Sequence, residues 1–419
     1  MINYLDLFAG AGGLSEGFIQ AGFFPVAHVE MDPAACFTLK TRTAYHWLYE
    51  HNMVETYNKY LRGEISRDGL YAAIPEQVLD SVLNYEISDE SLPVIFSKID
   101  RILYGKQLDL IIGGPPCQAY SLVGRARSDM QGDKRNYLYK LYAKFLDKYK
   151  PKYFVFENVV GLQSAKDEDG SLHFENMKKT FRECGYSVDF KVLNAHDYGV
   201  LQNRKRIILI GKLGAGNGFY PSVTKVNSDG ITVSEILEDL PAIRAGEGIY
   251  GPVTTKDYKG TYLYESKIKS FDHEPVTLHI ARPHTKQDLT IYRIAVETWN
   301  QKKERISYTD LPAHLRTHKN TTAFLDRFKV VARDLPFSQT VVAHISRDGH
   351  YYIHPDLVQN RSLTPREAAR LQTFPDNYYF ESTKTRPGRT AAFRQIGNAV
   401  PVRLAFSIAS ALKGVFCEE

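Results

Sequence analysis

The first thirty residues place a glycine-rich turn between two apolar runs, and this order constrains the fold more than any other feature. Residues 4–8 are largely apolar, glycines follow at positions 10, 12 and 13, and residues 14–21 suit a helix that Gly22 would end. Residues 26–29 predict a second strand, closed by Glu30. An acidic residue about 20 positions after such a turn can accept hydrogen bonds from a ribose. The chain therefore starts as an α/β unit, although its FAGAGG spacing differs from the GxGxxG of nicotinamide enzymes.

Length and composition indicate a large globular protein. Its 419 residues are 43% hydrophobic and 24% charged, enough apolar material for two domains or for one domain with a large insert. A net charge of +5 is compatible with a nucleic-acid partner but does not require one. No run approaches the ~18 uncharged apolar residues of a membrane span, and the chain enters a strand at its start. We therefore expect no membrane partner and no export signal.

The cysteines are too scattered for a disulfide framework or a CxxC zinc site, so we expect reduced thiols and no metal. They stand at positions 36, 117, 184 and 417. Cys117 is distinctive because it follows an apolar strand at residues 109–112 and the sequence GGPP, whose prolines stiffen the backbone. Taken alone, it would more often be a small buried hydrophobe.

Polar side chains mark the ends of the other predicted strands. Glu157 follows an apolar run at residues 153–156, and the sequence QNR precedes another run at residues 206–213. Ligands of open α/β sheets gather at the carboxyl ends of the strands. Four side chains should therefore converge on one rim: Asp6, Glu30, Cys117 and Glu157. A thiol beside a carboxylic acid can attack while the acid supplies a proton.

Six motifs in one order resemble those of the DNA (cytosine-5) methyltransferases, and they span nearly the whole chain. They are DLFAGAGG (6–13), PPCQ (115–118), ENV (157–159), QNRKR (202–206), LTPREAARLQTFPD (363–376) and QIGNAVP (395–401). The resemblance implies an α/β, Rossmann-like fold with a mostly parallel sheet, and S-adenosyl-L-methionine as cofactor, with S-adenosyl-L-homocysteine as product.

The resemblance also implies the chemistry of the site. The Cys117 thiolate would add to C6 of cytosine, C5 would take the methyl group, and loss of the C5 proton would release the cysteine. Glu157 matches the acid that contacts the base, and Arg204 and Arg206 match the arginines that steady this carboxylate and the target base. For Arg204, a surface ion pair near a strand start is the alternative.

Cofactor and DNA contacts carry over in the same way. The methionine portion would be surrounded by Phe8, Ala9, Gly10, Gly12, Gly13 and Leu14. Glu30 would hold the ribose, Met31 the adenine ring and Asp100 the adenine amine, although the neighbours of Asp100 fit the family less well. Further cofactor contacts would come from Pro116, Asn398 and Val400. The loop after the cysteine would touch DNA through Gln118, Ser121, Arg125 and Arg127, or else form a solvated basic surface.

The same comparison predicts a catalytic domain that is split in sequence. Residues 1–214 would form most of it, with a mostly helical insert at about 41–97, and residues 386–419 would complete it through a helix beside the first strand. Residues 215–385, which lack a βα rhythm, would form a smaller, irregular target-recognition domain.

Three competing functions stay open at this point. A tRNA cytosine-5 methyltransferase would share the core, a silent DNA-binding subunit would not need Cys117 and Glu157, and a nicotinamide oxidoreductase would leave PPCQ unexplained. We expect duplex DNA as the partner and a monomeric, cytoplasmic bacterial enzyme of a restriction-modification system, with a cognate restriction endonuclease that acts separately.

Overall fold

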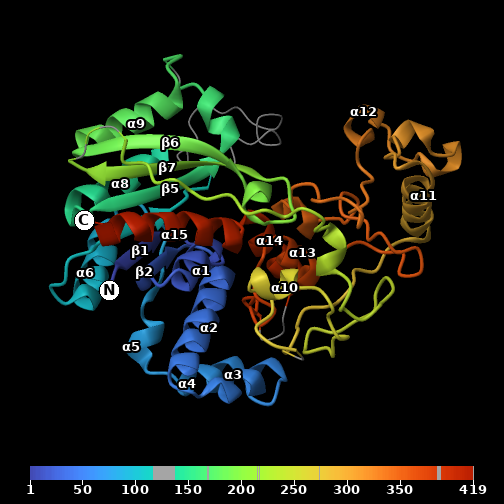
Figure 1. Ribbon diagram of the computed structural model, residues 1–419, viewed down its shortest axis with the longest axis horizontal. Coiled ribbons are helices and arrows are strands. Elements are labelled where there is room, and N and C mark those ends of the chain that lie inside the picture. The colour runs from blue at the N-terminus through green and yellow to red at the C-terminus, as the bar shows by residue number, and fades with distance from the viewer. Residues whose placement is uncertain are drawn as a thin grey trace.

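The computed structural model describes residues 1–116, 137–167, 169–214, 216, 218–272, 274–384 and 388–418, and its centre is a seven-stranded sheet (Figure 1). The strand order is β3-β2-β1-β4-β5-β7-β6. The strands are β1 (Asn3–Leu7), β2 (Phe24–Glu30), β3 (Val82–Asn84), β4 (Leu110–Gly113), β5 (Tyr153–Val159), β6 (Tyr186–Asn194) and β7 (Lys205–Leu213). The pairs from β3 to β5 are parallel, and β7 runs antiparallel to both of its neighbours. The mostly parallel sheet predicted from the sequence is confirmed.

Helices cover both faces of the sheet because successive strand residues point to opposite sides. Leu5 and Leu7 of β1 join one apolar cluster, which includes residues of α6 (Leu92–Leu103), α8 (Leu138–Tyr149) and α9 (His173–Glu183). Tyr4 joins the cluster on the other face, with residues of α1 (Gly13–Gln20) and α15 (Val402–Glu418). The carboxyl-terminal helix therefore packs into the core of the amino-terminal half.

The contact between α1 and α15 is close enough to require a glycine. A Cβ on Gly17 would lie 2.5 Å from the Cβ of Ala405 and 2.6 Å from the carbonyl oxygen of Val402. The segment Arg389–Cys417, which holds α14 (Arg389–Asn398) and most of α15, is long and apolar enough to cross a membrane by length and composition alone. In the structure its apolar residues lie in the core, where Leu404, Ile408 and Leu412 are fully buried.

The predicted insert at 41–97 is largely helical but also holds part of the sheet. Its helices are the later part of α2 (Pro33–Glu50), α3 (Val54–Leu61), α4 (Arg67–Ala72), α5 (Glu76–Leu79) and the start of α6. β3 lies between α5 and α6 and pairs with β2 at the sheet edge. Buried side chains of α2 to α5, Tyr57 among them, share a cluster with α13 (Pro365–Leu371) and α14.

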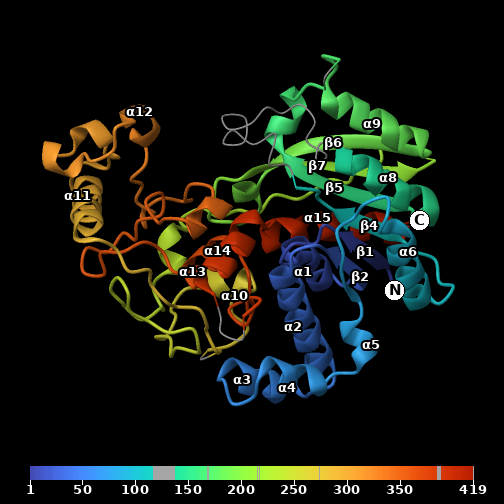
Figure 2. The same ribbon diagram turned by 180° about the vertical axis from the view of Figure 1, so that it is seen from behind.

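Residues 218–272 and 274–384 are mostly irregular, and their helices α11 (Lys286–Lys302) and α12 (Thr321–Phe324) lie beyond α13 and α14 at the end of the molecule away from the sheet in both views (Figures 1 and 2). The longest helix there, α11, has an apolar cluster of its own that includes Tyr292 and Phe328. The remaining short helices there are η4 (Val233–Ile236), α10 (Tyr262–Glu265), η5 (Tyr308–Asp310), η6 (Ala313–Leu315) and η7 (Ala343–Ser346). Two more, η2 (Val160–Ser164) and η3 (Ala195–Tyr198), follow β5 and β6.

Candidate active site

The strand order places the switch point of the sheet between β1 and β4. β1 pairs with β2 on one side and with β4 on the other, and the chain visits β2 and β3 before it returns to β4. Ligands of open α/β sheets bind outside the carboxyl ends of the strands at such a point. The glycine loop after β1 and the GGPP segment after β4 both leave the sheet here.

The glycine loop has a backbone conformation and close approaches that favour glycine. Phe8, Gly10 and Gly12 have positive φ angles of 57°, 56° and 76°. A Cβ on Gly13 would lie 2.4 Å from the carbonyl oxygen of Val400. The structure therefore brings the late QIGNAVP motif against the loop, although the two are nearly 400 positions apart in the sequence.

Glu30 at the end of β2 binds the glycine loop directly. Its Oε2 accepts a hydrogen bond from the Gly10 amide at 2.8 Å, and its Oε1 accepts one from the Asp32 amide at 2.7 Å. Burial raises the pKa of Glu30. The Asn84 side chain donates to the carbonyl oxygens of Glu30 and Met31, both at 3.0 Å. Met31 itself is exposed beside this carboxylate.

Three of the remaining expected cofactor residues line the same region with different exposure. Ala9 and Leu14 are buried at the two ends of the glycine loop, whereas Asn398 at the end of α14 is exposed. Pro116, which is exposed, is the last described residue before the segment that carries the thiol.

The segment after β4 passes directly over the expected acid. A Cβ on Gly113 would lie 2.3 Å from the carbonyl oxygen of Leu7, and one on Gly114 would lie 2.7 Å from Oε2 of Glu157. Glycines at these two positions let the backbone pass between β1 and the Glu157 carboxylate. The predicted nucleophile and DNA contacts follow this segment but lie outside the described residues: Cys117, Gln118, Ser121, Arg125 and Arg127.

Glu157 and Arg206 form an ion pair at the carboxyl end of β5. The Nε of Arg206 lies 2.7 Å from Oε1 of Glu157, and both side chains are mostly buried. The antiparallel register of β5 and β7 produces this contact, since it sets Arg206 opposite Val159, two residues beyond Glu157 on the same face. A second bond, from Nη1 to the carbonyl oxygen of Lys205 at 2.8 Å, restricts the guanidinium further. Arg206 therefore holds the Glu157 carboxylate in one orientation, at the end of the sheet where residues 113–116 leave β4.

Arg204 does not make the contact that was expected of it. Its guanidinium is buried and donates to three backbone carbonyl oxygens, at 2.5 Å to Val341, 3.2 Å to Gly397 and 2.9 Å to Ala399. It therefore joins the start of β7 to the segment around Val341 and to the QIGNAVP motif, rather than binding the Glu157 carboxylate. A surface ion pair, the alternative, is also wrong. A motif that places two arginines two residues apart does not reveal which of them pairs with the Glu157 carboxylate and which binds backbone carbonyl oxygens.

Asp100 lies near the amino ends of the strands, opposite the end where a cofactor contact is expected. It stands in the last turn of α6, where its carboxylate accepts from Nζ of Lys148 at 2.9 Å and from the Tyr149 hydroxyl at 3.0 Å. These partners end α8, which leads into the amino end of β5. Since the other candidates lie at the carboxyl ends of the strands, the prediction for Asp100 is wrong.

Two residues not singled out in the sequence, Asn84 and Tyr85, contact the end of β2 beside Glu30. The Tyr85 amide donates to the carbonyl oxygen of Glu30 at 3.0 Å, next to the Asn84 contacts. Both residues lie at the end of β3, which has three residues and no clear alternation. The signal that was available is the apolar pair Val82 and Leu83 ahead of a polar residue, inside a segment expected to be helical.

Comparison with known proteins gives the family of this architecture. The sequence matches the family described as C-5 cytosine-specific DNA methylase over residues 2–78 and 91–414. It is 42% identical to the Type II methyltransferase M.Bpa9945I of Bacillus paralicheniformis over 98% of both chains. It is 29% identical to the Type II methyltransferase M1.HphI of Haemophilus parahaemolyticus, over 98% of this chain and 86% of the other. A solved methyltransferase structure from an E. coli prophage shares the fold, with a TM-score of 0.64 and 23% identity over 100% of both chains. The chain therefore belongs to the C-5 cytosine-specific DNA methylase family.

Proposed function

We propose that this DNA cytosine-5 methyltransferase takes its methyl group from S-adenosyl-L-methionine and transfers it to a cytosine within one specific sequence of duplex DNA. The observation that carries the proposal is the adjacency of two sites at one switch point. The glycine loop with Glu30 follows β1 and β2, while residues 113–116, which precede Cys117 in the sequence, pass over the Glu157–Arg206 pair beside it. A methyl donor and a covalently held base would thus meet across β1 and β4.

The residues around the glycine loop suit S-adenosyl-L-methionine. Gly10 and Gly12 adopt positive φ angles, and because they have no side chains the cofactor can approach the backbone of the loop closely. The Glu30 carboxylate offers acceptor oxygens to ribose hydroxyls. Exposed Met31 supplies an apolar surface for a flat ring. When bound, the sulfonium supplies an electrophilic methyl group. In this proposal Val400 and the loop hold the donor facing the Glu157 rim.

The reaction proceeds through a bond between the protein and the base. The target cytosine leaves the base stack, and the Cys117 thiolate forms a bond to C6, which makes C5 nucleophilic. Glu157, held by Arg206, hydrogen-bonds the N3 edge as electrons move toward it. C5 takes the methyl group, a base removes the C5 proton, and the electron pair of that C–H bond expels the thiolate from C6.

The relatives support a role in restriction and modification. Both curated relatives named above are Type II methyltransferases, and each aligns with nearly the whole of this chain. We propose a monomeric enzyme of the bacterial cytoplasm, whose methylation protects a sequence from a separate cognate restriction endonuclease. Duplex DNA is favoured over tRNA as the substrate because both of these relatives are Type II methyltransferases.

The proposal is tested with a substrate that stops the reaction before release. Duplex DNA with 5-fluorocytosine at the target position has no C5 proton to lose, so the methylated base should stay bound to Cys117 through denaturing electrophoresis. Cys117→Ser is the control, because an alkoxide is far less accessible than a thiolate at neutral pH. Wild-type enzyme that methylates ordinary DNA but never forms this adduct would refute the covalent route. Faster transfer to tRNA than to duplex DNA would refute the assigned substrate.

A further inference from the structure

A buried tyrosine from the far part of the sequence reaches into the glycine loop. The hydroxyl of Tyr378 donates to the carbonyl oxygen of Ala11 at 2.5 Å, and a Cβ on Gly12 would lie 2.9 Å from the same hydroxyl. Tyr378 is 1% exposed. Ala11 stands between Gly10 and Gly12, the two glycines with positive φ angles. Tyr378 therefore contacts the loop between its two glycines with positive φ angles.

The Tyr378 ring is packed on several sides. The centroid of the Tyr378 ring lies 4.8 Å from that of Phe374 and 5.3 Å from that of Phe380. The guanidinium carbon of Arg42 lies 4.8 Å from the centroid of the Tyr378 ring. The Tyr378 carbonyl oxygen accepts a hydrogen bond from Nη2 of Arg366 at 2.8 Å. These contacts restrict the ring and therefore hold the Tyr378 hydroxyl at the Ala11 carbonyl oxygen.

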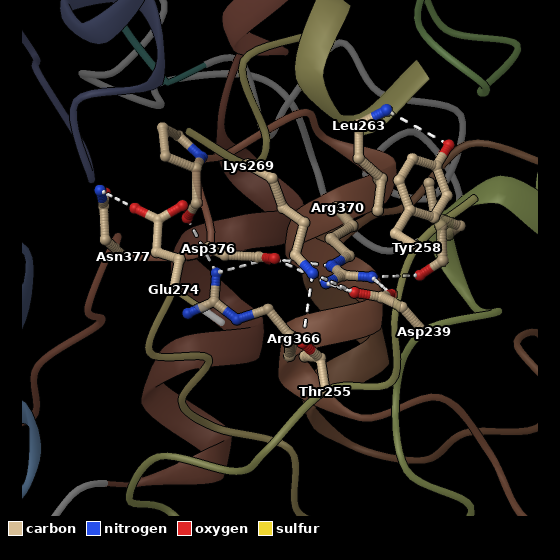
Figure 3. A network of polar contacts seen from close by, with 12 residues as sticks. Asp239, Thr255, Tyr258, Leu263, Lys269, Glu274, Arg366, Arg370, Asp376 and Asn377 are labelled. Atoms are coloured by element: carbon tan, nitrogen blue, oxygen red, sulfur yellow. Dashed lines mark hydrogen bonds and ion pairs between the residues drawn. The ribbon is translucent and has the colours of Figure 1, made fainter. Parts of the chain in front are cut away.

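The two residues before Tyr378 tie it to a buried network of charges (Figure 3). Arg370 binds both carboxylate oxygens of Asp376 at 2.8 and 2.6 Å and also reaches Asp239 at 2.5 Å. Lys269 lies 2.7 Å from Asp239, and all four of these side chains are buried. Asp239 and Lys269 are far from Tyr378 in the sequence, so these ion pairs help to fix where the segment carrying Tyr378 lies.

Asn377 links the same segment to the helix that follows the glycine loop. Its Oδ1 accepts from Nη1 of Arg42 at 2.8 Å, and its Nδ2 donates to Glu274 of the recognition region at 2.5 Å. Arg42 in turn binds both carboxylate oxygens of Glu16, in α1, at 2.9 and 2.5 Å. Residues 376–378 thus hold both the loop and the helix after it.

We propose that Tyr378 is a positioning residue for cofactor binding, acting through the Ala11 carbonyl. The Ala11–Gly12 peptide lies beside residues that tolerate many conformations, and the hydroxyl fixes one of them. Without that bond, the binding-competent loop would be only part of the population, and affinity falls by that fraction. The inference rests on the proposed use of this loop for S-adenosyl-L-methionine.

Tyr378→Phe tests the inference, with Tyr186→Phe as the matched control. Tyr186 at the start of β6 is also buried, and its hydroxyl donates to a backbone carbonyl, that of Pro151, at 2.8 Å, away from the glycine loop. Calorimetry with S-adenosyl-L-homocysteine should show about three- to tenfold weaker binding for Tyr378→Phe, the effect of one net hydrogen bond. Tyr186→Phe should bind as the wild type does. In turnover, KM for S-adenosyl-L-methionine should rise for Tyr378→Phe while kcat changes little.

Hydrogen exchange separates this inference from the proposed function. In protein without ligand, amides of residues 8–14 should exchange faster in Tyr378→Phe than in wild type or in Tyr186→Phe. Unchanged exchange and unchanged affinity would overturn the positioning role, as would equal losses in both variants. A wild-type protein that fails to bind S-adenosyl-L-homocysteine would refute the assigned cofactor instead, and the exchange result would still decide the role of Tyr378.

Discussion

Replacing Gly114 by alanine should displace the Glu157 carboxylate while leaving the rest of the fold in place. The new Cβ would lie 2.7 Å from Oε2 of Glu157 and 2.8 Å from its carbonyl oxygen. Both distances are about 0.6–0.7 Å shorter than ordinary van der Waals contact. The carbonyl cannot move aside, because Glu157 pairs with Ile208 of β7. The backbone of residues 114–116 and the carboxylate must therefore separate.

The expected loss is larger in rate than in stability. Overpacking of this kind costs about 1–3 kcal/mol of folding free energy. A positioned acid contributes about 10²–10⁴-fold to a rate, and a shift of about 1 Å can cost 10²-fold. Because the overlap approaches that shift and Gly114 is three positions before Cys117 in the sequence, we expect the rate of methyl transfer in Gly114→Ala to fall by about 10²-fold.

Single-turnover transfer to duplex DNA measures the rate of methyl transfer, and urea unfolding of the same variants measures the free energy of unfolding. Gly251→Ala is the control, since Gly251 has no heavy atom within 4 Å of its Cβ position and no positive φ angle. That variant should keep wild-type rate and stability. A Gly114→Ala enzyme that transfers methyl groups at nearly the wild-type rate would refute the view that this contact sets the geometry of the acid.

Other substitutions test the buried polar groups. Arg204→Met should cost about 2–4 kcal/mol of unfolding free energy, because three buried carbonyl oxygens lose their donor; a loss below about 1 kcal/mol in urea would contradict this. Arg370→Met should cost about 3–5 kcal/mol, because Asp239 and Asp376 lose their shared cation, and an unchanged urea midpoint would disprove it. Burial raises the pKa of Glu274 to about 7, so the folded protein holds this proton more tightly than the unfolded chain and loses stability as the pH rises from about 4.5 to 7. Glu274→Gln should lack this loss, and a stability difference from wild type that stays constant over that range would count against it.

Much of the site was predictable because its signals are local. A glycine turn between two apolar runs, with an acid at the end of the second, marked Gly10 and Glu30 as candidate cofactor contacts, and the structure places the Glu30 carboxylate 2.8 Å from the Gly10 amide. The end of an apolar run likewise marked Glu157. Such features depend on backbone freedom and on side-chain periodicity over a few residues, which a single sequence displays.

Contacts between distant segments were decided only by the tertiary structure. Whether Arg204 points to a carboxylate or to carbonyl oxygens depends on where residues 341 and 397–399 pack, and Asp100 was misplaced because β3 was not recognised as a strand. Tyr378 and Ala11 are 367 positions apart, and no periodicity in either segment indicates that they touch. By itself the sequence determined the elements and the chemistry at their ends. The packing of those elements determined which side chains meet, because burial forces each polar group to find a partner wherever the fold provides one.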